Sequence, residues 1–187
     1  MNKIELRKTA LARRNALTQG QIQIWSNEIC NQTISSQGFQ KARIVHIYKS
    51  FGSEVQTDQI IQKALESSKI VVVPVVLGNQ ILLHLQIFAN TVFTRDPFGI
   101  QNPTENYQLF DNQTLGINDL IIVPLVACDM RNNRIGYGKG FYDNFLAKIR
   151  SKKIGLAFKC QHVDNFEPDP WDVPLDQIIQ NKKPELE

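Results

Sequence analysis

The chain has 187 residues, 42% hydrophobic and 21% charged, a balance typical of a soluble globular protein with a substantial core. A net charge of +3 is too small to indicate a nucleic-acid or membrane surface by itself. Three cysteines without a CxxC pair signal neither a zinc site nor a disulfide framework, and they favour a reducing, cytoplasmic setting. The charged N-terminus lacks the apolar core of a secretory signal, and no apolar run approaches the ~20 residues that cross a bilayer.

Helix and strand patterns alternate through the first half of the chain. Apolar residues recur every three or four positions in the helical stretches and run together in the strands. The strongest strand pattern is apolar throughout, as in strands that a parallel sheet buries on both faces. The predicted elements are helices at 3–17 and after the N-cap candidate Thr18, a strand at 43–48, a helix around 60–65, and strands at 69–76 and 81–88 joined by a hairpin through Gly78 and Asn79.

The second half predicts a βαβ unit that follows a long loop. Residues 94–118 contain prolines and glycines, and a structureless loop of that length is often functional. The alternation of strands and helices predicts an α/β fold. We expect one three-layer, Rossmann-like domain over residues 1–187, with a largely parallel sheet covered on both sides. The remaining predicted elements are a strand at 119–124, a helix at 141–150, a strand at 153–158 and a short strand near 177–179.

The most informative stretch is Arg134-Ile-Gly-Tyr-Gly-Lys-Gly-Phe-Tyr-Asp143, with three glycines in five residues around Lys139. A glycine-rich turn that opens onto a helix exposes backbone N–H groups that can bind a phosphate, and Lys139 and Arg134 add positive charge. The spacing fits neither the Walker A pattern nor GxGxxG. The alternative is a tight strand-to-helix connection whose glycines only satisfy backbone geometry. The two cations favour a nucleotide site with phosphoryl chemistry.

Carboxylates near this loop are candidate ligands for a divalent cation. Asp143, in the first turn of the following helix, either binds metal or interacts with the helix dipole. Mg²⁺ that binds together with nucleotide phosphates needs only one or two protein carboxylates. Asp176 is a candidate second ligand, and spacing alone does not choose between it, Asp172 and Asp169.

Two further groups allow alternative interpretations. Lys3, Arg7 and Arg14 form either a solvated basic face or a set of cations that holds a triphosphate. Glu54 follows a strand end, where ligands gather in α/β sheets, or it is a surface acid in a turn. A nucleic-acid-binding module that uses the basic strip is disfavoured, because net charge is low and the chain carries no recognised binding signature.

The segment Val123-Pro-Leu-Val-Ala-Cys-Asp129, followed by residues 133–143, closely resembles the signature of the 5-formyltetrahydrofolate cyclo-ligase family. Weaker marks follow in the family's order over nearly the whole chain. They are Lys3-x-x-x-Arg7, Glu54-Val-Gln-Thr57, Phe98-Gly-Ile100 with Pro103, and Asp172-Val-Pro-Leu-Asp176.

The resemblance implies an enzyme that uses ATP and Mg²⁺ to convert 5-formyltetrahydrofolate into 5,10-methenyltetrahydrofolate, with release of ADP and phosphate. The γ-phosphoryl group would pass to the formyl oxygen, and N10 of the folate would then close the ring as phosphate leaves. The protein would align the reactants and neutralise charge. The folate is the expected partner of a monomer that binds neither nucleic acid nor membrane. The leading rival is another ATP- or phosphosugar-using α/β protein with a similar anion loop.

The resemblance also implies roles for individual residues by their motif positions. Lys139 and Arg134 would be catalytic, and Asp143 and Asp176 would hold Mg²⁺. The folate would contact Lys49, Glu54, Gly138, Lys139, Gly140, Phe141 and Tyr142. ATP would contact Lys3, Arg7, Arg134, Ile135, Gly136, Tyr137, Gly138, Lys139, Gly140, Phe141 and Tyr142.

Overall fold

The computed structural model describes residues 2–77 and 81–182. Within these residues, seven strands form one sheet in the order β4-β3-β2-β1-β5-β8-β9. The five strands from β2 to β9 are parallel, and β3 and β4 add an antiparallel edge. The strands of the sheet are β1 (Ile44–Ile47), β2 (Ile70–Leu77), β3 (Ile81–Arg95), β4 (Gln101–Leu109), β5 (Leu120–Val123), β8 (Lys152–Ala157) and β9 (Gln177–Gln180).

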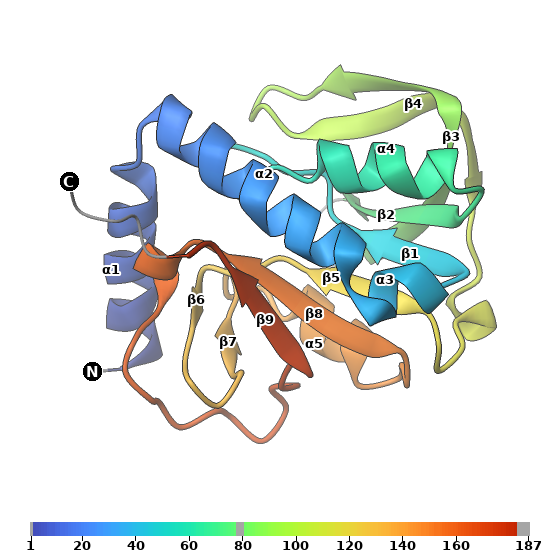
Figure 1. Ribbon diagram of the computed structural model, residues 1–187. Helices are drawn as coiled ribbons and strands as arrows, with labels where there is room; N and C mark the ends of the chain where they lie inside the picture. The colour runs from blue at the N-terminus through green and yellow to red at the C-terminus, as the bar shows by residue number, and fades with distance from the viewer. Residues whose placement is uncertain (1, 78–80, 183–187) are drawn as a thin grey trace.

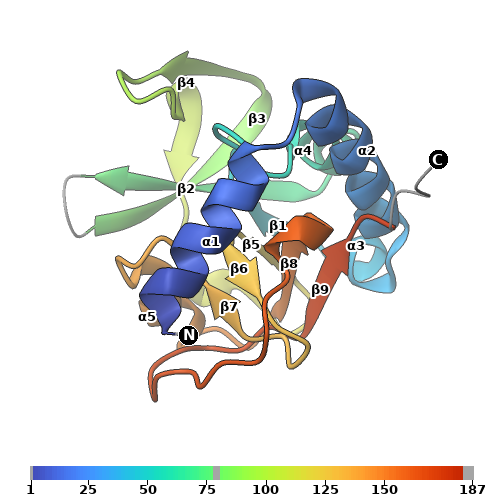
Figure 2. The ribbon, with the colours of Figure 1, turned by 90° about the vertical axis from the view of Figure 1, so that its left-hand side faces the viewer.

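Helices cover both faces of the sheet, so the predicted α/β fold with a largely parallel sheet is confirmed. In Figure 1, α2, α3 and α4 lie in front of the sheet, α5 lies behind it, and α1 stands at its left-hand end. Figure 2 looks from that end and shows α1 crossing in front of a small two-stranded sheet, β6–β7. These elements are α1 (Lys3–Asn15), α2 (Gln19–Ser35), α3 (Gln37–Lys41), α4 (Asp58–Glu66), α5 (Phe141–Leu146), β6 (Ala127–Cys128) and β7 (Arg134–Ile135), with short 3₁₀ helices η1 (Asn112–Thr114) and η2 (Lys159–Gln161).

Reciprocal side-chain caps fix the starts of the first two helices. The Asn2 side chain accepts a hydrogen bond from the Glu5 amide at 2.9 Å, and the Glu5 carboxylate accepts one from the Asn2 amide at 3.1 Å. Thr18 and Gln21 form the same arrangement at the start of α2, which confirms Thr18 as an N-cap. Each N-cap side chain contributes about 1 kcal/mol. The first cap places Lys3 in the first turn of α1.

Three clusters of buried side chains hold the layers together. The first joins α2, α3 and α4 to one face of the sheet. The second packs α5 against Ile121 and Val123 on the opposite face. The third buries Leu6 and Ala10 of α1 against Ile135 and its neighbours. The third cluster therefore attaches the helix that carries the basic strip to the strand that leads into the glycine-rich loop.

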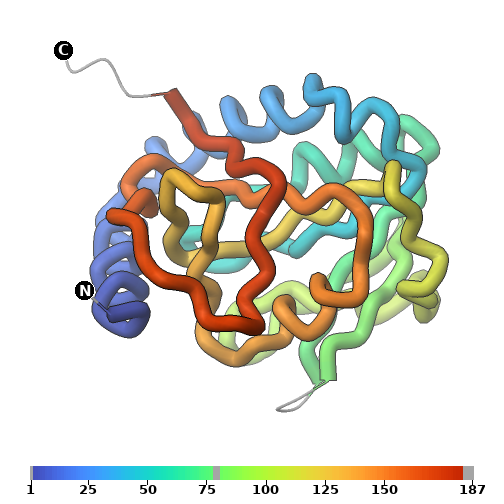
Figure 3. Tube along the Cα trace, turned by 90° about the horizontal axis from the view of Figure 1, so that it is seen from below, coloured from blue at the N-terminus to red at the C-terminus, as the bar shows by residue number. Residues whose placement is uncertain are grey.

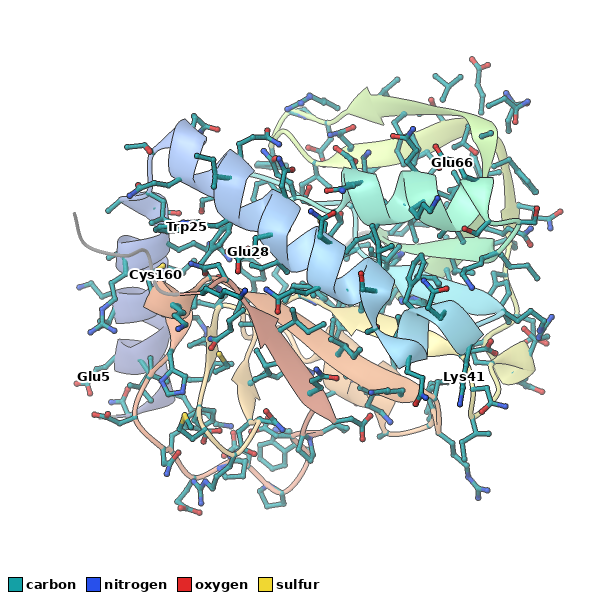
Figure 4. All side chains as sticks on the ribbon, in the orientation of Figure 1. Glu5, Trp25, Glu28, Lys41, Glu66 and Cys160 are labelled. Atoms are coloured by element: carbon teal, nitrogen blue, oxygen red, sulfur yellow. The ribbon has the colours of Figure 1, made fainter. Side chains whose placement is uncertain are left out.

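The helices carry exposed charged side chains. Figure 4 draws all described side chains and labels three of these, Glu5 of α1, Lys41 of α3 and Glu66 of α4. Among the helices of residues 2–77 and 81–182, none combines the length and apolar character that a membrane-spanning helix needs.

The prediction of a long loop at 94–118 was wrong. The segment contains the end of β3, the strand β4 and the 3₁₀ turn η1. Because β4 is an edge strand with mostly exposed residues, it lacks the apolar alternation that marks a half-buried strand. Pro103, which argues against a central strand, is tolerated at the edge of a sheet opposite Phe93.

The two strands predicted to form a hairpin do pair. β2 and β3 are antiparallel, with a register that extends to Leu77 opposite Ile81, and the predicted turn residues Gly78 and Asn79 lie outside the described residues. The expectation that the apolar strand at 69–76 is buried on both faces was wrong at its C-terminal end. Val76 and Leu77 are about half exposed, because the hairpin extends past the parallel strands.

The order of the strands sets the position of a crevice. From β1 the next parallel strand, β2, lies on one side, and β5 followed by β8 lies on the other. In open α/β sheets, ligands bind at the carboxyl ends of the strands where the order reverses in this way. Glu54 follows β1 and the 134–143 loop follows β5, so both leave the sheet at this edge. Figure 3 shows the C-terminal tail, coloured orange to red, running past the N-terminal end of α1 and past β6–β7.

Gly155 in β8 provides a test of this packing. A Cβ atom at this position would lie 2.6 Å from methyl carbons of both Leu125 and Leu175, so we expect Gly155→Ala to lower the free energy of unfolding by about 1–3 kcal/mol in urea denaturation. Gly20→Ala is the control, because its nearest neighbour would be Thr18 Oγ1 at 4.0 Å and alanine favours a helix. Equal stability of Gly155→Ala and the unsubstituted protein would contradict the packing described here.

Candidate active site

A cleft of about 700 Å³ opens at the carboxyl edge of the sheet. Its wall is built from α1, the segment after β1, the β2–β3 hairpin, the 134–143 loop and the C-terminal tail. Its apolar lining comprises Phe51, Val76, Leu82, Ile100 and Trp171. Its charged lining comprises Lys3, Arg7, Arg134, Lys139, Asp143, Asp169 and Asp172.

The glycine-rich loop turns sharply between β7 and α5. Gly138 has φ of 90° and Gly140 has φ of 70°, a region that side chains of L-residues rarely adopt. A Cβ atom at Gly138 would stand 3.3 Å from the guanidinium carbon of Arg7. The glycines therefore let the backbone of the loop approach the arginine closely, which a larger residue would prevent.

Two arginines of α1 bind this loop. Arg7 Nε donates a hydrogen bond to the carbonyl oxygen of Gly136 at 2.8 Å. Arg14 Nη2 donates to the hydroxyl oxygen of Tyr137 at 2.9 Å. Arg7 faces the cleft, whereas Arg14 is only 3% exposed. The interpretation of the strip as a solvated face does not hold for Arg14, and the strip anchors the loop.

Three ion pairs lie among the charged residues that line the cleft. Arg134 Nη2 contacts Asp143 Oδ1 at 2.6 Å, and the backbone N–H of Val173 in the tail donates to the same oxygen at 3.3 Å. Lys3 pairs with Asp172 and also with Asp169, the latter at 2.7 Å. Each pair joins a predicted nucleotide-binding cation to a carboxylate that also faces the cleft.

The structure separates the candidate metal ligands. Asp143, Asp169 and Asp172 line the cleft, whereas Asp176 does not. Asp176 is exposed, and its carboxylate accepts a hydrogen bond from the backbone N–H of Lys153 at 2.7 Å, beside the start of β8. Because the cleft lies at the carboxyl end of the strands, the geometry favours Asp172 over Asp176 as the partner of Asp143. No group of three or more histidine, cysteine or acidic residues forms a metal-binding cluster within residues 2–77 and 81–182.

Lys49 and Glu54 do not line the cleft. Lys49 pairs with Asp58, and its ammonium lies 5.0 Å from the centre of the Phe93 ring. Glu54 is 7% exposed and accepts a hydrogen bond from the Tyr137 hydroxyl at 2.7 Å. Burial raises the pKa of Glu54, and the Tyr137 hydrogen bond together with the nearby positive charge opposes that shift. Glu54 is therefore linked to the cleft by its hydrogen bond to Tyr137, which lines the cleft.

Two buried polar atoms at the cleft have no hydrogen-bond partner among the described residues. They are the hydroxyl of Tyr142 and Nε of Arg134, and both residues contribute to the lining. Burial raises the pKa of Tyr142, so its hydroxyl stays protonated and can donate. Buried polar groups in proteins are normally satisfied, which makes these two atoms suitable contacts for a ligand. Ile135, by contrast, is 2% exposed, and its side chain packs in the core beneath the loop.

A sequence model of the 5-formyltetrahydrofolate cyclo-ligase family matches residues 1–181. The chain belongs to this family. A relative from Haemophilus influenzae named 5-formyltetrahydrofolate cyclo-ligase is 36% identical over 146 residues, which cover 74% of this chain and 76% of the relative. Family membership implies an ATP-dependent enzyme.

Solved structures of cyclo-ligase relatives share the fold. The structure of 5,10-methenyltetrahydrofolate synthetase from Aquifex aeolicus aligns with a TM-score of 0.81 and 28% identity, covering 98% of this chain and 91% of that one. The 5,10-methenyltetrahydrofolate synthetase from Mycoplasma pneumoniae aligns with a TM-score of 0.76 and 26% identity, covering 96% and 98%. The likeness therefore extends over the elements that build the cleft.

The Arg134–Asp143 pair yields a stability prediction for this family member. Asp143→Asn leaves a buried guanidinium without its carboxylate, so we expect the free energy of unfolding to fall by about 1–3 kcal/mol in urea denaturation without ligands. Asp164→Asn, at an exposed position, serves as the control and should change stability little. If Asp143→Asn proved as stable as the control, the pair would not contribute to holding the loop.

Proposed function

We propose that the cleft converts 5-formyltetrahydrofolate into 5,10-methenyltetrahydrofolate with consumption of ATP. The observation that carries this conclusion is that the family's 134–143 loop lines one cleft together with a charged lining and an apolar lining. A triphosphate needs the first environment and a pterin with its aryl group needs the second.

The charged lining of the cleft fits a nucleotide triphosphate. Lys3, Arg7, Arg134 and Lys139 all face the cleft, and the loop between them exposes backbone near Arg7. Several cations around one anionic chain neutralise the charge that develops as a phosphoryl group moves. The residues from Arg134 to Tyr142, with Lys3 and Arg7, are therefore the proposed ATP-binding set, and Lys139 and Arg134 are the proposed catalytic cations.

Asp143 and Asp172 are the residues that would hold Mg²⁺. Both carboxylates face the cleft, and two protein carboxylates suffice for a magnesium ion that also binds phosphates. When bound, the ion would neutralise phosphate charge. Without ligands, Arg134 and Lys3 pair with these carboxylates. Binding of nucleotide with metal would therefore exchange each cation's carboxylate partner for a phosphate.

The apolar lining of the cleft fits the folate. Phe51 and Trp171 offer flat surfaces to the pterin and aryl rings, and Tyr142 offers an unused hydroxyl. The formyl oxygen is a poor leaving group, so its phosphorylation activates the formyl carbon for attack by N10. Phosphate then leaves, the N10 proton is lost, and the ring closes. The protein contributes alignment of the two ligands and exclusion of water.

The lining residues come from segments between Lys3 and Asp172 that lie far apart in the sequence, which supports a single domain over residues 1–187. We propose that this domain acts as a monomer. The small net charge supports a cytoplasmic enzyme whose partner is the folate, with neither nucleic acid nor membrane involved.

The activity is tested by following the absorbance of the methenyl product after mixing protein, 5-formyltetrahydrofolate and MgATP. We expect product only when both substrates are present, with one ADP formed for each methenyl group. ATP consumption that ignores the folate would favour another nucleotide-using enzyme. A salt-dependent gel shift without turnover would favour a nucleic-acid-binding protein.

Lys139→Ala tests the proposed catalytic cation. Lys139 is exposed and faces the cleft, so the fold should be kept, whereas kcat should fall by roughly 100-fold because positive charge near the moving phosphoryl group is lost. Lys148→Ala, another exposed lysine outside this cleft, should keep normal turnover. Normal kcat in Lys139→Ala would assign the role to Arg7 and Arg134.

A magnesium titration of two aspartate variants separates the candidate ligands. We expect Asp172→Asn to raise the Mg²⁺ concentration for half-maximal activity by about tenfold, since a charged ligand becomes neutral. Asp176→Asn should leave the titration nearly unchanged, because Asp176 lies outside the cleft. The reverse result would restore Asp176 as the metal ligand.

A further inference from the structure

Arg14 is a buried cation that the proposed reaction does not yet use. It is 3% exposed, and its guanidinium donates to Ser53 Oγ at 3.0 Å, to the Leu125 carbonyl at 3.4 Å and to the Tyr137 hydroxyl at 2.9 Å. Among the described residues, no carboxylate lies within ion-pairing distance of it. A buried guanidinium without a counter-ion is costly, so its retention requires an explanation.

The carboxylate of Glu54 is linked to Arg14 through the hydroxyl group of Tyr137. Tyr137 accepts the hydrogen bond from Arg14 and donates its own proton to Glu54 Oε1 at 2.7 Å. The backbone N–H of Phe51 donates to the second oxygen of Glu54 at 3.1 Å. A tyrosine hydroxyl can accept one bond and donate one, so this chain fixes the direction of its proton. Arg14, Tyr137 and Glu54 thus form one polar unit, and it joins α1, the glycine-rich loop and the segment after β1.

The surroundings of Glu54 contain a single positive charge. Burial and the charge of the Glu54 carboxylate raise the pKa of three nearby tyrosines: Tyr48 just after β1, Tyr137 in the loop and Tyr142 in α5. All three hydroxyl groups therefore stay neutral. Burial also raises the pKa of Glu54, while Arg14 lowers it. Among the described groups that shift this carboxylate, Arg14 is the one cation.

We propose that Arg14 is a positioning residue that supplies the counter-charge of Glu54 and, through the Tyr137 hydroxyl, holds the glycine-rich loop against it. The inference rests on the proposed function. Ring closure creates a cation delocalised over N5, the methenyl carbon and N10. A carboxylate fixed behind the cleft wall stabilises that charge as it forms, provided the carboxylate is ionised. Arg14 therefore acts on the reaction without touching either ligand.

The experiment compares Arg14→Met, Arg14→Lys and the control Arg13→Met by the pH profile of kcat/KM for methenyl formation. Arg13 is exposed, and its described polar contact is a weak one, to the His162 carbonyl at 3.4 Å. We expect Arg14→Met to lose roughly 100-fold in kcat/KM through misplacement of the loop. Its acid limb should also move to higher pH, because Glu54 without its cation protonates more readily. Arg14→Lys keeps the charge, so its acid limb should stay near that of the unsubstituted enzyme, and Arg13→Met should match that enzyme throughout.

The shift of the acid limb distinguishes positioning from simple support of the fold. An Arg14→Met enzyme that loses the same fraction of activity at every pH would overturn the proposal. If Arg14→Met does not fold, Tyr137→Phe answers the same question, because it keeps both charges and removes only the bridge. Its acid limb should also move to higher pH, and an unmoved limb would refute the bridge. If the unsubstituted protein makes no methenyl product, the proposed function itself is refuted. If the unsubstituted protein makes the product but the acid limbs of the variants do not shift, only the role of Arg14 is refuted.

Discussion

The contact between α1 and the glycine-rich loop is the interaction on which the cleft depends. Leu6 and Ala10 attach the helix to the strand that leads into the loop, and Arg7 and Arg14 then bind the loop itself. The loop can approach Arg7 because Gly138 has no side chain. One helix thereby fixes the backbone and the positive charge that a triphosphate requires.

Concentrating cations at one edge of a sheet carries an electrostatic cost, and the cleft offsets it with carboxylates. Lys3 pairs with Asp172 and Arg134 pairs with Asp143, so the unliganded site is close to locally neutral. The same carboxylates suit a divalent ion and the same cations suit phosphates. Nucleotide and metal arriving together can therefore replace every broken ion pair, whereas either one alone leaves charges unmatched. Under the proposed function, this complementarity would favour MgATP over free ATP.

Much of the fold was predictable because its signals are local. The apolar run at β2 and the cap at Thr18 each appear within a few consecutive residues, and the βαβ unit around β5 and β8 is one continuous segment of the chain. The strand β4 was missed because an exposed edge strand needs no apolar pattern. The motif at 134–143 identified the loop, but spacing could not show that Asp172 rather than Asp176 reaches it. The apolar lining of the cleft and the role of Arg14 could not be predicted from the sequence either, since both arise from segments that only the fold brings together.

In the proposed reaction, the cleft brings the terminal phosphate of ATP to the formyl oxygen of the folate. Substrate carrying ¹⁸O in its formyl group tests this transfer, with the released phosphate analysed by mass spectrometry. We expect each phosphate to carry one labelled oxygen, because the formyl oxygen leaves as part of it. Unlabelled phosphate, with the label recovered in water, would show that the formyl oxygen is not phosphorylated.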